Sequence, residues 1–280
     1  MKTSVSLFLS DILPARRKMF HKIVKNDIFY GLSADEGLRA LKKGGLDGVE
    51  VCLSQYYETT DADLEELLAL LKKHDLPVLS VHQTLRFFSS TRVPEITRLF
   101  AIASTLSAKL VVLHMNSAQK QIYDPVYIDA LHRLENRYNI KVTFENMEKH
   151  IGSLFYEHRW HDVKFSELVY KTDFNITLDT VHLAHSGGDI IEFFKKYKER
   201  IINIHLSDYR HHIFNSSIRP MRYKHMPIGE GDLPITAFLK TLREEKYNGL
   251  VTMEIHGDIQ DICNGAKIIN AAKSHGFTLF

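Results

Sequence analysis

Eight short runs of apolar, mostly β-branched residues recur along the 280-residue chain, and each is followed by an amphipathic helical pattern. From the second run to the seventh, the starts lie about 30 residues apart, which is the length of one βα unit. We expect strands at 3–9, 48–53, 78–82, 110–114, 141–145, 176–179, 201–205 and 249–254. Regular alternation of strand and helix favours one parallel sheet, and eight such units close naturally into a (β/α)₈ barrel.

Helix start and stop signals support this α/β interpretation. Ser33 followed by Glu36 has the pattern of a capping box, and Thr60 opens a leucine-rich helical pattern. Gly44-Gly45 lies just before the next strand, as a short αβ turn should. The alternative fold is a doubly wound open sheet, but the glycine-rich phosphate fingerprint expected after its first strand is absent. The sequence therefore favours a TIM barrel.

Composition indicates one soluble domain spanning residues 1–280. Hydrophobic content is 44%, charged content is 25%, and no low-complexity or Pro/Gly/Ser-rich linker marks a boundary. A net charge of +2 argues against a dedicated nucleic-acid binder, although a local patch could serve that role. Two distant cysteines fit a reducing compartment, and no apolar run approaches the ~20 residues of a membrane span. We therefore expect a cytoplasmic protein with no membrane contact; its oligomeric state stays open.

Two connections are too long to be plain turns, and both lie on the face where a barrel carries its site. They are residues 10–32 after the first strand and 207–232 after the seventh. Both are basic, with Arg16, Arg17, Lys18, Lys22 and Lys25 in the first and Arg210, Arg219, Arg222 and Lys224 in the second. Such loops would suit an anionic ligand, and a solvated charged surface is the alternative.

Six successive strands end in Asp, Glu or His. The six residues are His82, His114, Glu145, Asp179, His205 and Glu254. One histidine at a strand end is more often an ordinary polar residue than a ligand, and Asp179 could simply cap the turn that contains His182. Together the six residues indicate a common site, because the strand ends of a barrel point at one axis. A cluster of imidazoles and carboxylates without thiolates suits Zn²⁺, Mn²⁺ or a similar divalent ion, and the chain holds 16 histidines.

The sequence resembles the xylose-isomerase-like barrel superfamily over nearly its whole length. The most specific segments are Leu178-Asp179-Thr180-Val181-His182, His205-Leu206-Ser207-Asp208 and 225–232 (HMPIGEGD), supported by Phe144-Glu145-Asn146 and Met253-Glu254. That superfamily contains sugar and sugar-phosphate isomerases and epimerases, together with the endonuclease IV type of abasic-site nuclease. The resemblance implies that one divalent ion is held by a quartet of residues, Glu145, Asp179, His205 and Glu254.

The nuclease branch implies up to two further ions. Glu145 would bridge to a second ion held by His82 and His114, and a third would need His182, His225 and an Asp two residues before His225. Tyr223 stands in place of that Asp. Leu85 also stands where the nuclease branch places a DNA-wedging tyrosine. One to three ions are therefore compatible with the sequence.

Three functions follow from the resemblance. The leading one is a metal-dependent isomerase or epimerase of a small sugar or sugar phosphate. It would move a proton through an enediolate with Glu145 and Glu254 as acid and base. His182 would contact the substrate oxygen, His225 would bind metal or substrate, and Arg210 could hold a phosphate. The alternatives are abasic-site DNA cleavage by a multinuclear zinc cluster and a barrel that binds metal or sugar without turnover.

Overall fold

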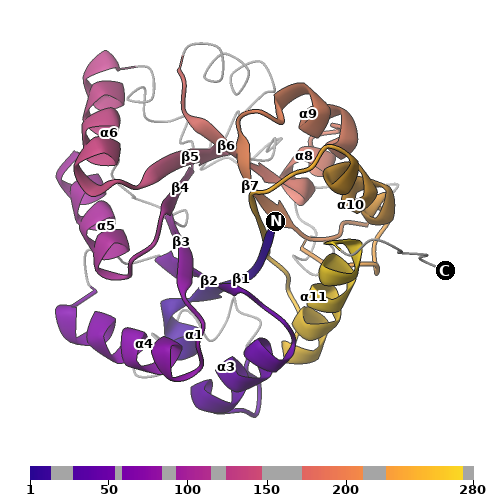
Figure 1. The fold of residues 1–280 in the computed structure, drawn as a ribbon, viewed down its shortest axis with the longest axis horizontal. Helices are drawn as coiled ribbons and strands as arrows, with labels where there is room; N and C mark the ends of the chain where they lie inside the picture. The colour runs from indigo at the N-terminus through magenta and orange to yellow at the C-terminus, as the bar shows by residue number, and fades with distance from the viewer. Residues whose placement is uncertain are drawn as a thin grey trace, which may run out of the picture.

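The computed structural model describes residues 1–13, 28–53, 59–83, 93–114, 124–146, 172–210 and 225–273. Within them, eight parallel strands form a closed barrel in chain order, and β8 pairs with β1 to complete it (Figure 1). The strands are β1 Lys2–Phe8, β2 Gly48–Leu53, β3 Val78–Gln83, β4 Leu110–His114, β5 Lys141–Glu145, β6 Asn175–Asp179, β7 Ile201–Leu206 and β8 Leu250–Met253. The predicted α/β barrel is confirmed. The first and last residues of each strand lie within one residue of their predicted positions.

Helices form a ring around the strands (Figure 1). They are α1 Leu9–Ile12, α3 Ala34–Lys43, α4 Asp61–Lys73, α5 Val93–Thr105, α6 Pro125–Tyr138, α8 Thr180–His185, α9 Ile190–Tyr197, α10 Ile235–Glu244 and α11 Ile259–Lys273. The predicted capping box before α3 is present, since Ser33 accepts from the Glu36 amide and Glu36 accepts from the Ser33 amide. Thr60 caps α4 in the same way with Asp63.

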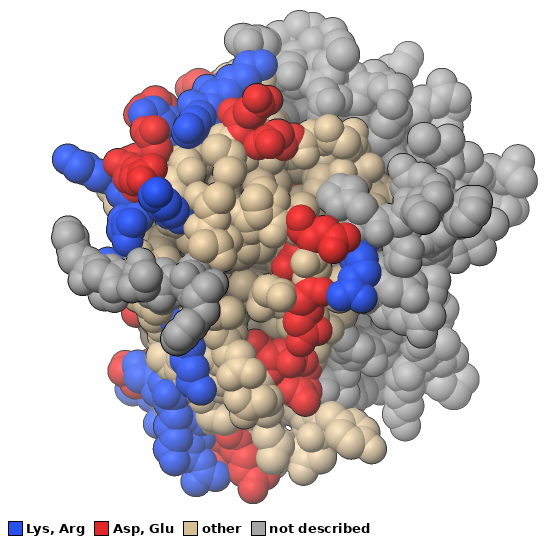
Figure 2. Space-filling view, turned by 90° about the vertical axis from the view of Figure 1, so that its right-hand side faces the viewer, with Lys and Arg blue, Asp and Glu red and all other residues tan. Residues whose placement is uncertain are grey.

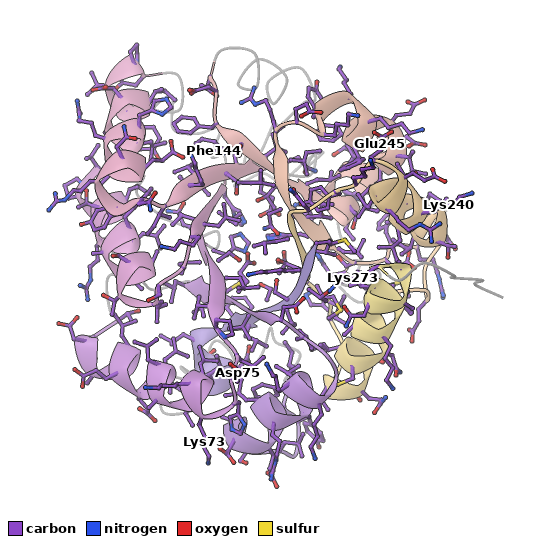
Figure 3. The ribbon with its side chains drawn as sticks, viewed as in Figure 1. Lys73, Asp75, Phe144, Lys240, Glu245 and Lys273 are labelled. Atoms are coloured by element: carbon purple, nitrogen blue, oxygen red, sulfur yellow. The ribbon has the colours of Figure 1, made fainter. Side chains whose placement is uncertain are left out.

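The two sides of the barrel wall differ in polarity. Outward-facing strand residues such as Val142 and Phe144 belong to the apolar core between strands and helices, and Figure 3 shows Phe144 near the outside of the wall. The alternating inward positions are polar on most strands. Because successive side chains of a strand point to opposite faces, a strand that alternates apolar and polar residues places the apolar ones against the helices and the polar ones inside the barrel. The main core therefore lies outside the barrel wall.

Hydrogen bonds link the hydroxyl and amide side chains inside the barrel. The Ser4 and Thr252 hydroxyls lie 2.8 Å apart, Thr252 donates to Asn203 at 3.0 Å, and Thr143 and Thr177 share a bond of 2.6 Å. Branched aliphatic residues dominate the interior of many TIM barrels. Paired hydroxyl and amide groups avoid the cost of unsatisfied buried polar atoms. They also place polar side chains directly below the carboxyl ends of the strands.

The two long connections are described only at their ends. The basic residues predicted in 10–32 (Arg16, Arg17, Lys18, Lys22, Lys25) and most of those in 207–232 (Arg219, Arg222, Lys224) lie outside the described residues, as do Tyr223 and Leu85. Figure 2 shows the side that carries α10 and α11, where acidic side chains form a band next to the grey residues. Among the described helices, we find none that is long and apolar enough to span a membrane.

Candidate metal centre

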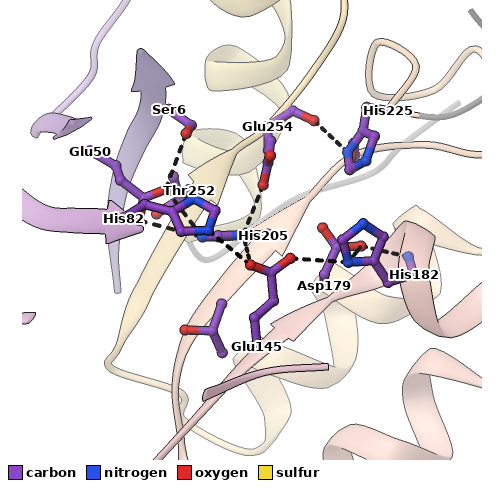
Figure 4. A network of polar contacts seen from close by, with 12 residues as sticks. Ser6, Glu50, His82, Glu145, Asp179, His182, His205, His225, Thr252 and Glu254 are labelled. Atoms are coloured by element: carbon purple, nitrogen blue, oxygen red, sulfur yellow. Dashed lines mark hydrogen bonds and ion pairs between the residues drawn. The ribbon is translucent and has the colours of Figure 1, made fainter. Parts of the chain in front are cut away.

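Side chains from strands across the barrel meet at the carboxyl ends (Figure 4). The predicted quartet is brought together: Glu145, Asp179, His205 and Glu254 each offer one ligand atom, and these atoms lie within 4.8 Å of one another. Glu145 and Asp179 close β5 and β6, whereas His205 is the penultimate residue of β7. Glu254 follows the last residue of β8 and is the most exposed of the four, with 30% of its side chain accessible.

Glu145 also joins a second group with His82 and His114. Its Oε2 lies 3.1 Å from His82 Nε2 and 3.0 Å from His114 Nε2, and the two histidine nitrogens lie 2.7 Å apart. The β4–β5 register explains part of this geometry, because His114 pairs directly with Glu145. Both predicted histidines therefore lie beside the quartet.

A third group contains Asp179, His182 and His225, whose ligand atoms again lie within 4.8 Å of one another. His182 Nδ1 lies 3.0 Å from Glu145 Oε1, so this group adjoins the first two. The rings of His182 and His225 are perpendicular, with centroids 5.4 Å apart. The described residues of this group thus reproduce the predicted His182–His225 pair.

Asp179 caps the turn, and its second oxygen is left for the metal role that the sequence also predicted. Its Oδ1 accepts the His182 amide at 2.6 Å and caps α8, while Asn146 bonds the Asp179 backbone on both sides. Its Oδ2 is buried and has no hydrogen-bond partner among the described residues. One oxygen fixes the turn, and the other is available to the cluster.

Other buried polar atoms of the cluster share this condition. The described residues provide no hydrogen-bond partner for His114 Nδ1, Glu145 Oε1 and Oε2, His205 Nδ1 or Glu254 Oε2. Glu145 Oε2 nevertheless lies 3.0 Å from His114 Nε2, and Glu254 Oε2 lies 2.8 Å from His205 Nδ1. Buried carboxylate oxygens are costly unless a proton or a cation neutralises them. Imidazole and carboxylate donors without thiolate fit Zn²⁺ or Mn²⁺. The residues present therefore fit a divalent ion.

Burial and charge move the pKa values of these groups in opposite directions. Burial alone would raise the pKa of Glu145, but His114 and His205 outweigh it and hold that pKa well below its usual range. At Asp179 burial prevails and raises the pKa to about 7. Burial lowers the pKa of His225 to about 4. An ionised Glu145 and a neutral His225 near pH 7 are the protonation states that metal ligands need.

Asp208 organises the loop that carries His225. Its carboxylate accepts the backbone amides of Tyr209, Gly229 and Leu233 at 2.8–3.1 Å, and its backbone forms an antiparallel bridge with Met226. His225 has a φ of +50° and its Nδ1 lies 3.1 Å from the Glu254 carbonyl oxygen. The segments 205–208 and 225–232 thus form one unit whose geometry positions His225.

Arg210, the predicted phosphate-holding residue, is exposed. Its guanidinium donates to the Glu230 carbonyl oxygen at 2.6 Å. This contact ties Arg210 to the loop at 225–232, and its role toward a phosphate stays a prediction.

The sequence interpretation missed Glu50. This residue lies in the middle of β2 and is fully buried among the histidines of the site. The prediction considered only strand ends, where Glu50 does not lie. The available signal was a single acidic residue between Val49 and Val51 in an otherwise apolar strand, because a lone buried carboxylate requires partners.

Comparison with known proteins gives the family. A family model for the xylose isomerase-like TIM barrel matches residues 38–275. An uncharacterized protein of Mycobacterium leprae is 24% identical over 248 residues, which cover 81% of this chain and 85% of that protein. An inosose dehydratase of Clostridium botulinum is 26% identical over 176 residues, or 55% of this chain and 59% of the dehydratase.

A solved structure shares the whole fold. The crystal structure of a D-tagatose 3-epimerase-like protein matches with a TM-score of 0.67 at 19% identity, and the match covers 97% of each chain. Identity this low shows a common fold and leaves the reaction open. Together with the family match over most of the sequence, it shows that this chain belongs to the xylose isomerase-like TIM barrel family.

Proposed function

We propose that this protein is a metal-dependent isomerase or epimerase that acts on a small sugar or sugar phosphate by proton transfer through an enediolate. The observation that carries the proposal is the quartet, in which two glutamates from β5 and from the end of β8 flank the same position. Glu145, Asp179, His205 and Glu254 would hold the ion. A divalent ion bound there would stabilise negative charge on adjacent substrate oxygens.

The two glutamates supply the proton acceptor and donor. Burial alone would raise the pKa of Glu254, but His205, with Nδ1 2.8 Å from Glu254 Oε2, lowers it to about 2. Glu254 is therefore a carboxylate that can accept a proton, and its partial exposure places it toward the mouth of the barrel. Glu254 would return the proton taken from one carbon to the neighbouring carbon, while Glu145, an ionised carboxylate on β5, would accept the proton of a substrate hydroxyl and pass it to the adjacent oxygen.

His182 would contact the substrate. Its side chain is 12% exposed, at the edge of a site whose other members are mostly buried. Its Nδ1 is held near the Asn146 carbonyl oxygen and Glu145, which fixes the orientation of the ring. A fixed imidazole at the edge could bind the oxygen next to the reacting carbon.

The names of similar proteins agree with this substrate class. Inosose dehydratase and D-tagatose 3-epimerase both denote reactions on polyhydroxylated carbonyl compounds. Epimerisation, isomerisation and dehydration of such compounds can all begin with removal of a proton beside a carbonyl. We therefore favour a ketose, or a phosphate of one, as the substrate.

Abasic-site DNA cleavage is the second candidate. The observation that favours it is the His82, His114 and Glu145 group beside the quartet. Clustered ions held by these groups could activate a water and stabilise the leaving oxygen of a phosphodiester. This function requires more than one ion per chain, whereas the isomerase requires only the ion of the quartet.

Metal analysis and two substrate assays test these functions. Protein purified without chelator should contain one divalent ion and should convert at least one member of a panel of ketoses and their phosphates. Two or three ions together with cleavage of an abasic duplex would replace the isomerase with the nuclease. Absence of bound metal after supplementation with Zn²⁺ and Mn²⁺ would refute both functions.

A further inference from the structure

Glu50 lies inside the barrel beneath the candidate metal centre. It is fully buried, and its carboxylate accepts hydrogen bonds from the Ser6 hydroxyl at 3.1 Å and from the Ser80 hydroxyl at 2.7 Å. The hydroxyls come from β1 and β3, the strands on either side of β2. Three adjacent strands therefore hold this carboxylate in one orientation.

The same carboxylate faces two histidines of the site. Glu50 Oε1 lies 3.4 Å from His82 Nδ1 and 3.2 Å from His205 Nε2. His82 is on β3 and His205 on β7, which are four strands apart in the closed barrel. Their ring centroids are only 5.0 Å apart (Figure 4). One buried group thus contacts rings that arrive from opposite walls.

Each ring turns its other nitrogen toward the cluster. His82 Nε2 lies 3.1 Å from Glu145 Oε2, and His205 Nδ1 lies 2.8 Å from Glu254 Oε2. An ionised carboxylate only accepts hydrogen bonds, so the ring nitrogen that faces Glu50 carries a proton. The other nitrogen of each ring faces Glu145 or Glu254, which belong to the quartet that would hold the metal. In a neutral imidazole the opposite nitrogen then keeps its lone pair for a metal.

We propose that Glu50 is a shared positioning residue, which holds a proton on His82 Nδ1 and on His205 Nε2 and thereby directs His205 Nδ1 into the metal-binding quartet. This inference rests on the proposed metal-dependent function. Carboxylates that bond the second nitrogen of a metal-bound histidine fix its tautomer and its orientation. Here the Glu50 carboxylate fixes both rings. It places the proton on Nδ1 of His82 but on Nε2 of His205.

Glu50, His82 and His205 could alternatively hold an ion themselves, because their ligand atoms also lie close together. The contacts favour the positioning role. Two serine hydroxyls already occupy the carboxylate, and an ion at this depth would use the very ring nitrogens that face away from the quartet. The ion count distinguishes the two roles.

Zinc titration of chelator-stripped protein tests the proposal. Glu50→Gln should weaken zinc binding by about 10- to 100-fold without changing the number of ions bound. Ser4→Ala is the matched control, because it removes a buried interior hydroxyl that bonds Thr252 and has no described contact with either histidine. The zinc affinity of this variant should stay within about twofold of wild type. Unchanged affinity in Glu50→Gln, or loss of one whole ion, would overturn the positioning role.

The histidine tautomers provide a second measurement on the wild-type protein, which decides the matter even if Glu50→Gln does not fold. In zinc-loaded protein labelled with ¹⁵N-histidine, NMR should show a proton on His82 Nδ1 and on His205 Nε2. A proton on His205 Nδ1, or none on His82 Nδ1, would overturn this inference alone. Failure of the wild type to bind zinc would overturn the proposed function and this inference with it.

Discussion

Asp179→Asn should stabilise the metal-free protein but should gain less stability than wild type when metal is added. Asp179 is fully buried, and burial is the largest cause of the rise of its pKa from 3.8 to about 7. His182 lowers this pKa, whereas Glu145 and Glu254 raise it further. Without a metal, ionising this carboxylate near pH 7 therefore works against folding.

The size of the effect follows from linkage. A carboxyl group whose pKa is higher in the folded than in the unfolded state contributes its full stability below pH 3.8 and loses it as the pH rises to 7. About three pH units at ~1.36 kcal/mol each amount to about 4 kcal/mol. Asparagine does not ionise, but its amide nitrogen would replace Oδ2, which has no hydrogen-bond partner among the described residues, and burying that nitrogen would cost about 1–3 kcal/mol. The net gain should be about 1–3 kcal/mol above pH 7, should pass through zero between about pH 4.5 and 6, and should become a loss of about 1–3 kcal/mol near pH 4.

Urea unfolding followed by far-UV circular dichroism measures this difference. In EDTA, Asp179→Asn should be more stable than wild type at pH 8 and should lose that advantage toward pH 4. In zinc at 100 times Kd, wild type gains about 2.7 kcal/mol and the variant, lacking a ligand, gains less. Asp189→Asn is the control, because Asp189 is an exposed cap of α9 and belongs to none of the possible ligand groups among the described residues. Lower stability of Asp179→Asn in EDTA at pH 8 would refute the reasoning.

Three further substitutions test separate parts of the site. Glu254→Gln should abolish isomerase turnover with an unchanged circular dichroism spectrum, and wild-type turnover would contradict its role as a proton carrier. Asp208→Ala removes an acceptor of three backbone amides, so urea unfolding should show a loss of at least about 3 kcal/mol; a loss below about 1 kcal/mol would show that the loop does not depend on it. His114→Ala should retain the single ion of the quartet and its turnover, and loss of one ion would favour the nuclease.

The strands and the convergence of the strand-end residues could be predicted from local patterns, whereas the choice of the quartet among those residues came from the family resemblance. Parallel strands buried on the helix side read as apolar runs, and their spacing gives the βα period. Once a barrel is assumed, residues at strand ends converge by symmetry, so Glu145, Asp179 and His205 could be grouped without knowing any distance. The sequence offered the cap as an alternative to metal binding by Asp179, and the structure shows that the cap uses only one of the two carboxylate oxygens.

Contacts across the barrel could not be predicted in this way. Glu50 on β2 meets His205 on β7, three strands away around the barrel, only because both side chains reach into a polar interior. Strand order gives neither the rotamer nor the depth of each residue. Arg210 was predicted to hold a phosphate because of its charge. Charge alone does not show where a side chain points, and the guanidinium contacts the Glu230 carbonyl oxygen. Sequence patterns thus indicated which residues approach the axis, whereas the partners of each nitrogen and oxygen required the structure.

Glu145 shows why the number of bound ions decides between the two candidate reactions. Its Oε2 faces His82 and His114, its Oε1 faces His182, and the carboxylate also belongs to the quartet. If only the quartet holds an ion, one oxygen of Glu145 is left beside His182 and can carry a proton to or from a substrate. If His82 and His114 held a second ion, Glu145 would be a ligand shared by both ions and would be less able to transfer protons. The same residues therefore support proton transfer with one ion and hydrolysis with several, and ion stoichiometry separates the two mechanisms.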